Sequence, residues 1–86
     1  MDKEMMRAVF MGVVDNQIDA NDPPETKQTL DRLISEGWSL DDAKALLCQC
    51  VIVEIFRVGK HEEPFNEKRF VYNLKNLPNE PVEIIP

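Results

Sequence analysis

The 86-residue sequence has few of the side chains from which reactive or metal-binding sites are built. It contains one histidine, His61, and two cysteines, Cys48 and Cys50. A structural zinc site needs about four ligands, and a hydrolytic triad needs a nucleophile set against a histidine and an orienting acid. The sequence shows no spacing of either kind. We therefore expect no catalytic residues, no cofactor and no enzymatic activity.

The cysteines and the histidine are better explained as structural or surface residues. Cys48 and Cys50 are two positions apart, and in a helix such residues point about 200° away from each other. They can then neither pair nor hold one metal ion together. We expect both thiols to be buried, with an exposed thiol or a disulfide across a dimer as alternatives. His61 falls in an expected polar loop, where it would be solvated.

Long apolar runs are also missing. The most apolar segment, residues 39–58, is interrupted by Lys44, Gln49, Glu54 and Arg57, whereas a membrane span needs about 20 apolar residues. The first residues do not have the pattern of a signal peptide, and a reducing compartment is then the expectation for two cysteines. We expect a cytoplasmic protein without a membrane partner.

Basic residues are outnumbered. Ten lysines and arginines face 16 aspartates and glutamates, which gives a formal net charge of −6. Such a chain repels nucleic acids and anionic membranes. Residues 29–52 could be taken for a DNA-binding helix-turn-helix, but the second helix would begin with Asp41 and Asp42, which phosphates repel. We expect no nucleic-acid partner.

What the sequence does contain is a strong central helix signal. Ser39 is placed to cap a helix with an acidic first turn, and Trp38 is placed to pack on Ala43 across that cap. Gly59 would end the helix by adopting a left-handed conformation. The sequence therefore predicts a helix over residues 40–58.

Apolar side chains cover most of the circumference of this predicted helix. One broad face holds Ala43, Leu46, Leu47, Cys50, Val51, Ile55 and Val58. A second set outside that face holds Ala45, Cys48, Ile52 and Phe56. A helix that is apolar nearly all round is surrounded by other helices, or is shared with a second copy of the chain.

Three further helices are predicted at residues 2–20, 23–36 and 67–77. Asp22 would cap the second helix, with Pro23 in the first helical position, and Gly37 would end it. Asn66 would cap the last helix. The link between the second and third helices is so short that the two should pack as neighbours.

The expected fold is an all-α four-helix bundle, formed by residues 1–78 as one domain, with an extended C-terminal tail, residues 79–86. The expected core residues of the outer helices are Met5, Met6, Val9, Phe10, Val13, Val14, Leu30, Leu33, Ile34, Phe70, Val71, Leu74 and Leu77. Although a terminus is often disordered, the tail carries Val82, Ile84 and Ile85. We expect it to dock in part, as a strap or a short strand.

So small a chain has more apolar surface than one core can bury, mainly in residues 5–14 and 43–58. Domains of this length are also marginally stable unless something such as oligomerisation is added. We therefore expect a protein–protein interaction module, most simply one that forms a homodimer or another homo-oligomer. The candidate interaction residues are Trp38, Phe10, Val13, Ile52 and Phe56.

The alternative is a bundle that binds a metal ion or a small ligand through inward carboxylates. Asp15 and Asp19 are four residues apart on the first predicted helix, and Glu54 projects from the central one. Metal-binding bundles usually add a Glu-x-x-His motif on two helices, which this chain lacks. Glu54 and Gln17 are alternatively polar groups that face a partner.

Two resemblances cover part of the chain. The pattern Gln17, Asp22-Pro23-Pro24, Leu30-x-Arg32-Leu33, Glu36-Gly37 and Ala43 resembles a family of short bacterial proteins of unknown function. That resemblance implies a bacterial helical protein with no assigned activity. Several members of that family carry histidines near the positions of Asp41 and Ala45, so a metal role would not transfer to this chain.

The second resemblance is local. Gly37-Trp38-Ser39, followed by Ala43 and Ala45-Leu46, is similar to the Gly-aromatic loop and the next helix of ubiquitin-associated domains. The resemblance implies that such a loop can serve as a binding surface, which is one reason to include Trp38 among the candidates. The central helix predicted from this sequence is longer than the helices of that three-helix fold.

Overall fold

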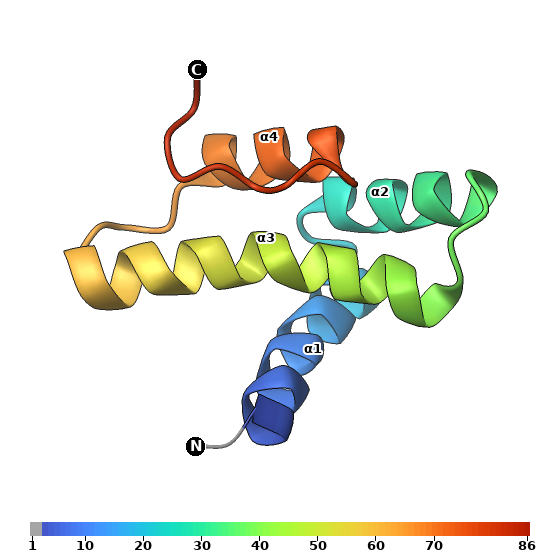
Figure 1. Cartoon of the computed structure of the whole chain (residues 1–86), viewed down its shortest axis with the longest axis horizontal. Coiled ribbons are helices and arrows are strands. Elements are labelled where there is room, and N and C mark those ends of the chain that lie inside the picture. The colour runs from blue at the N-terminus through green and yellow to red at the C-terminus, as the bar shows by residue number, and fades with distance from the viewer. Residues whose placement is uncertain (1–2) are drawn as a thin grey trace.

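The computed structural model describes residues 3–86 and contains four helices (Figure 1). They are α1 (Lys3–Ala20), α2 (Pro24–Ser35), α3 (Leu40–His61) and α4 (Glu67–Asn76). No strand occurs between residues 3 and 86. The expectation of an all-α four-helix fold with an extended tail is confirmed. Within this range, none of the helices is both long and apolar enough to cross a bilayer.

The long helix α3 is the central element. Helices α1, α2 and α4 each pack against it, and α2 also contacts α1 and α4. Figure 1 shows α2 and α4 along one side of α3, whereas α1 leaves the other side at a steep angle. The N-terminal half of α1 and the last turns of α3 therefore extend away from the point where the helices meet.

Local signals define several helix ends as expected. The Ser39 side chain accepts a hydrogen bond of 3.1 Å from the Asp42 backbone amide, and Asn66 caps α4 in the same way. After α2, Gly37 adopts a φ of +102°. The amides of Gly37 and Trp38 then donate back to Ile34 and Leu33 at 3.0 and 3.1 Å, which satisfies carbonyl groups that the helix end would leave free.

Two predicted helix ends are wrong. Pro23, not Asp22, occupies the cap position of α2, and no side chain caps that helix. Helix α3 does not stop at Gly59 but continues to His61, so the histidine lies in a helix rather than in a loop. Glu62 takes the left-handed conformation instead, with a φ of +54°, and its amide bonds to the carbonyl of Arg57.

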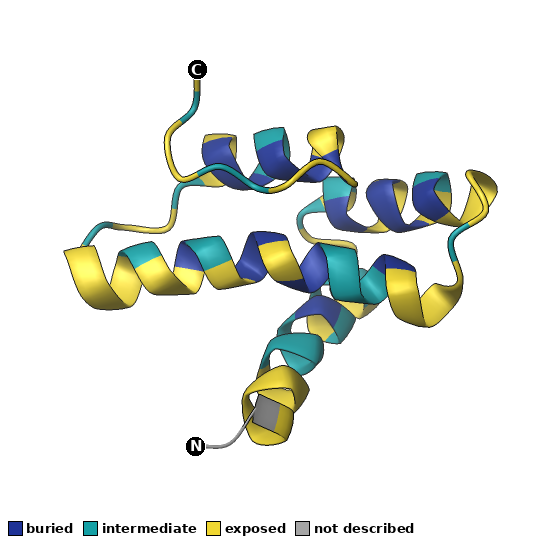
Figure 2. Ribbon diagram, viewed as in Figure 1, coloured by how far each residue is buried: buried dark blue, intermediate teal, exposed yellow. Residues whose placement is uncertain are grey.

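The core forms where the four helices meet (Figure 2). Its buried apolar residues are Val14, Leu30, Leu33, Ala43, Leu47, Cys48, Cys50, Val51, Phe70, Leu74 and Leu77. Of the first predicted helix face, only Val14 is fully buried, while Met5, Met6 and Val9 are 58%, 41% and 53% exposed. The physical reason is that the N-terminal half of α1 extends beyond the other helices (Figure 2).

Other expected core residues are also exposed. Ile34, Ile55 and Val58 are 43%, 41% and 44% exposed. On α2, Thr26 and Thr29 are buried in place of Ile34. The Thr26 hydroxyl donates to the Gln17 side chain at 2.9 Å, so a polar group can be buried there without losing its hydrogen bond.

Two glycine substitutions should have opposite effects on the free energy of unfolding. An added Cβ meets no atom within 4 Å at either Gly37 or Gly59. Gly37→Ala should destabilise by about 1 kcal/mol because its backbone is left-handed. Gly59→Ala should stabilise by about 0.5 kcal/mol because Gly59 lies within α3. Urea unfolding followed by circular dichroism measures both, and destabilisation by Gly59→Ala would show that α3 ends there.

Candidate functional site: an apolar groove beside a buried ion pair

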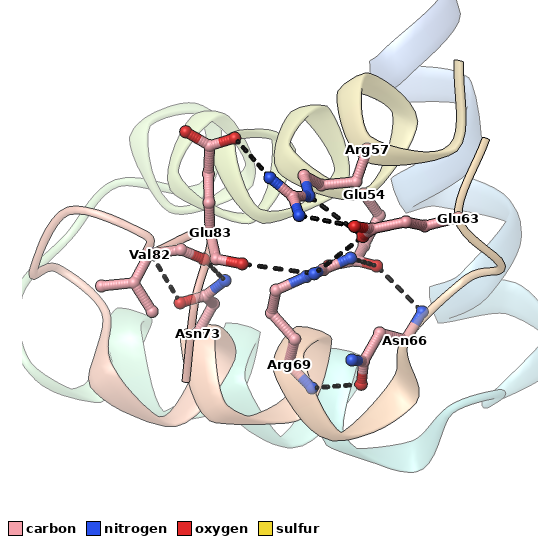
Figure 3. Close-up of polar contacts among 8 residues, drawn as sticks. All are labelled: Glu54, Arg57, Glu63, Asn66, Arg69, Asn73, Val82 and Glu83. Carbon is pink, nitrogen blue, oxygen red and sulfur yellow. Dashed lines mark hydrogen bonds and ion pairs between the residues drawn. The ribbon is translucent and has the colours of Figure 1, made fainter. Parts of the chain in front are cut away.

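A buried ion pair connects α3 to α4. The Glu54 and Arg69 side chains are only 2% and 5% exposed. Arg69 donates through Nε to Glu54 Oε2 at 2.6 Å and through Nη2 to Oε1 at 2.9 Å. The backbone amide of Asn66 donates to the same carboxylate at 3.0 Å (Figure 3). The carboxylate is thus paired and hydrogen-bonded, as a buried charge requires.

A second pair extends this network toward the end of α3. Arg57 binds Glu63 through two hydrogen bonds, of 2.6 and 3.0 Å, and Arg69 lies 3.6 Å from Glu63. The hydrogen bond from Arg57 lowers the pKa of the Glu63 carboxyl group, and the hydrogen bond to Glu54 raises the pKa of Arg69. The loop between α3 and α4 is therefore held at both of its ends, and it carries Phe65.

An apolar groove opens beside this network, between α1 and the C-terminal half of α3. Its volume is about 350 Å³. The lining residues are Val13, Gln17, Val51, Glu54, Ile55, Val58, Gly59, Phe65 and Phe70. Phe65 and Phe70 pack together with their ring centroids 5.5 Å apart, so the loop forms one wall of the groove.

The two polar groups of the lining are already bonded. Gln17 accepts from Thr26, and the Glu54 carboxylate is bound by Arg69 and Asn66. Gln17 and Glu54 both line the groove, where a partner could meet them, and both are bonded within the chain. The groove offers apolar contact and no unpaired charge, which suits an apolar occupant.

The structure separates the five candidate interaction residues. Val13 lines the groove, and Phe10 is half-buried against the core beside it. Ile52 and Phe56 are 43% and 41% exposed on α3. Trp38 packs on the core at the other end of α3, next to the α2–α3 link, so it does not belong to the groove.

Phe56 is engaged within its own helix. Its ring lies edge-on to His61 at a centroid distance of 5.6 Å, and the Lys60 ammonium lies 5.2 Å from the ring centroid. Both contacts exist because α3 continues past Gly59. Phe56 thus has a partly covered ring face, and Ile52 is the more accessible of the two.

Three residues that line the groove, Ile55, Val58 and Phe65, were not predicted from the sequence as site residues. Ile55 and Val58 were expected in the core, and Phe65 was placed in a polar loop. One signal in the sequence did point to them. Apolar residues cover a wide arc of the second half of α3, and its two neighbours there, α1 and the short helix α4, cannot cover all of it.

The acidic residues of the metal-binding alternative are not brought together. Asp15 binds Lys44 at 2.8 Å, and that hydrogen bond raises the pKa of the lysine. Glu54 is held by Arg69, and Asp19 is exposed. Among residues 3–86, no group of three histidine, cysteine, aspartate or glutamate side chains could hold a metal ion.

Both cysteines are free and buried, in agreement with the first of the sequence interpretations. Cys50 is fully buried, and burial raises the pKa of its thiol to about 12. Burial also raises the pKa of Cys48, whose Sγ lies 3.9 Å from Met11 Sδ. Neither thiol has the environment of a reactive cysteine, which needs exposure and a lowered pKa.

Comparison of the chain with protein-family models, curated proteins and solved structures found no match. The resemblances to the short bacterial proteins and to ubiquitin-associated domains therefore stay predictions. The geometry of the chain is then the basis for any proposed function.

The buried ion pair should matter far more than an exposed one. Glu54→Gln should lower the free energy of unfolding by about 3 kcal/mol, because it leaves the buried Arg69 charge with only Glu63, 3.6 Å away, as a counter-ion. Glu36→Gln is the matched control, since Glu36 forms an exposed pair with Arg32 at 3.0 Å and should change stability by less than about 0.5 kcal/mol. Chemical unfolding measures both variants, and equal losses would contradict a dominant role for the Glu54–Arg69 pair.

The thiols should be unreactive in the folded protein. At pH 8 a thiol with a pKa near 12 is ionised in only about one molecule in ten thousand, and the thiolate is the reactive form. Ellman's reagent should therefore release almost no colour from native protein and two equivalents after unfolding in guanidinium chloride. Fast reaction of either cysteine in the native state would contradict the burial of Cys48 and Cys50.

Proposed function

We propose that the protein is a self-associating module without catalytic activity, which forms a homodimer by burying the groove between α1 and α3. The supporting observation is the position of its exposed apolar side chains. Eleven large ones are exposed among residues 3–86, and six of them line this groove or lie on the protruding half of α1. These six are Met5, Met6, Val9, Ile55, Val58 and Phe65.

The chain exposes somewhat more surface than a compact monomer of its mass. A compact monomer of this mass is expected to expose roughly 5,200 Å², and the chain exposes 5654 Å². The excess, roughly 450 Å², is about half of what each partner loses in a standard protein–protein interface. Figure 2 shows mostly exposed residues in the N-terminal part of α1 and at the C-terminal end of α3.

A second copy is the occupant that this surface fits best. In a two-fold dimer the same patch meets itself, so a groove must be matched by a ridge on the same patch. Val9 and Met6 continue the row of Val13 along the protruding half of α1, and they supply such a ridge. The absence of unpaired charge in the groove lining lets two chains of net charge −6 meet there without placing like charges in contact.

One matched pair of variants tests this function. Ile55→Glu places a charge in the groove, and Ile34→Glu makes the same change at a site of equal exposure, 43% against 41%, on α2. Ile55→Glu should weaken the dimer by at least about thirty-fold in Kd, because a carboxylate would be buried without a partner. Ile34→Glu should leave the Kd unchanged.

Size-exclusion chromatography with light scattering, over a concentration series, measures the dimer. Because each subunit is acidic, added salt should strengthen the association by screening long-range repulsion. A wild-type protein that stays monomeric at high micromolar concentration refutes self-association. A dimer that both variants weaken equally refutes the groove as its interface.

A further inference from the structure

The C-terminal tail is bound in a way that resembles a peptide in a binding site. The side-chain amide of Asn73 contacts both main-chain polar groups of Val82 (Figure 3). Its Nδ2 donates to the Val82 carbonyl at 3.0 Å, and its Oδ1 accepts from the Val82 amide at 2.9 Å. The Asn73 side chain thereby bonds to the main chain of Val82 as a neighbouring β-strand would. Neither bond depends on the Val82 side chain.

The next tail residue is bound by two arginines. Arg69 Nη1 donates to the Glu83 carbonyl at 3.2 Å, and Arg57 Nη1 lies 3.5 Å from the Glu83 carboxylate. The first contact holds the backbone, and the second favours an acidic side chain at this position. The site therefore accepts a chain through its main-chain groups and favours an acidic residue at the position of Glu83.

Two of the three side chains that hold the tail are fixed within the bundle, since Arg69 is bound by Glu54 and Arg57 is bound by Glu63. Asn73 lies within α4, and its exposure of 1% is that of the protein with the tail in place. An asparagine inside α4 is a poor helix former and needs partners for its buried amide. The side-chain amide of Asn73 finds those partners on the tail, so α4 carries this residue for an extended ligand.

The tail, in contrast, is weakly attached. Ile84 is 79% exposed, Glu83 is exposed, and Val82 and Ile85 are only half-buried. Segments with few buried apolar contacts open locally at a much lower free energy than the core. Arg57 and Arg69 keep their partners on the bundle when the tail leaves, and the side-chain amide of Asn73 is then free to bind another chain.

From this asymmetry we propose that the α3–α4 face is a binding site for a segment of another protein that presents its main chain to Asn73 and carries an acidic residue at the next position. Residues 81–85 occupy the site as a displaceable ligand of the chain itself. The tethered tail acts at an effective concentration in the millimolar range, so it suppresses binding of a free segment. Arg57 is two residues from Ile55, so the helical period places it on the other side of α3 from the groove, and no tail residue lines the groove.

The test uses full-length protein and a fluorescein-labelled peptide with the sequence of residues 79–86. Val82→Pro in the protein removes the amide that Asn73 binds and frees the site from its own tail. In fluorescence anisotropy titrations, the peptide should bind the Val82→Pro protein about ten-fold more tightly than wild type, in line with the loss of a buried hydrogen bond from the competitor. The same peptide N-methylated at Val82 should not bind, and the Glu83→Gln peptide should bind more weakly.

A second measurement uses the wild-type protein alone, in case the proline variant loses its fold. Hydrogen exchange of the Val82 amide, followed by NMR, should accelerate in proportion to the concentration of added unlabelled peptide, because the peptide binds only when the tail is open. The Leu74 amide in α4 is the control and should not change.

Four outcomes would overturn the proposal. The first two are equal affinity of the peptide for the wild-type and Val82→Pro proteins, and binding of the N-methylated peptide. The other two are no binding of the peptide to the Val82→Pro protein at millimolar concentration, and an exchange rate of the Val82 amide that does not change when peptide is added. Loss of a wild-type dimer on Val82→Pro would also overturn it, because the tails would then be exchanged between copies. Peptide binding that survives Ile55→Glu separates this site from the proposed dimer.

Discussion

The arrangement of this protein depends on one buried ion pair, Glu54 with Arg69. Two charges that are 2% and 5% exposed have lost most of their hydration, so each needs the other in a fixed geometry. The two bonds between them fix the C-terminal half of α3 against the start of α4. The same carboxylate also accepts a hydrogen bond from the Asn66 amide, so the loop that ends in Asn66 is fixed to α3 as well.

The apolar groove and the tail-binding face both derive from that pair. On one side, the fixed loop presents Phe65 as a wall of the groove. On the other side, Arg69 has donors left over and uses one for the carbonyl of Glu83. An arginine can serve two partners because its guanidinium carries five donors in a rigid plane. A small bundle thereby presents an apolar surface on one side of α3 and a polar, backbone-binding surface on the other.

The sequence predicted well what depends on neighbours in the chain. Ser39, Asn66 and Gly37 define helix ends through bonds that span only a few residues. It predicted less well which apolar side chains are buried, since Ile34, Ile55 and Val58 were expected in the core and are exposed. It also could not show that Glu54 meets Arg69, 15 residues further along, because nothing local distinguishes this glutamate from a solvated one.

The sequence by itself determined the helical class, the approximate extent of the four helices and the excess of apolar surface, because local hydrogen bonding and periodicity depend on neighbouring residues. Only the tertiary structure decided where that excess lies, which charges are buried, and that Asn73 binds the tail. These features depend on the angle at which α1 leaves α3 (Figure 1) and on contacts between residues distant in sequence. Such contacts are set by the packing of the whole chain and not by any one segment.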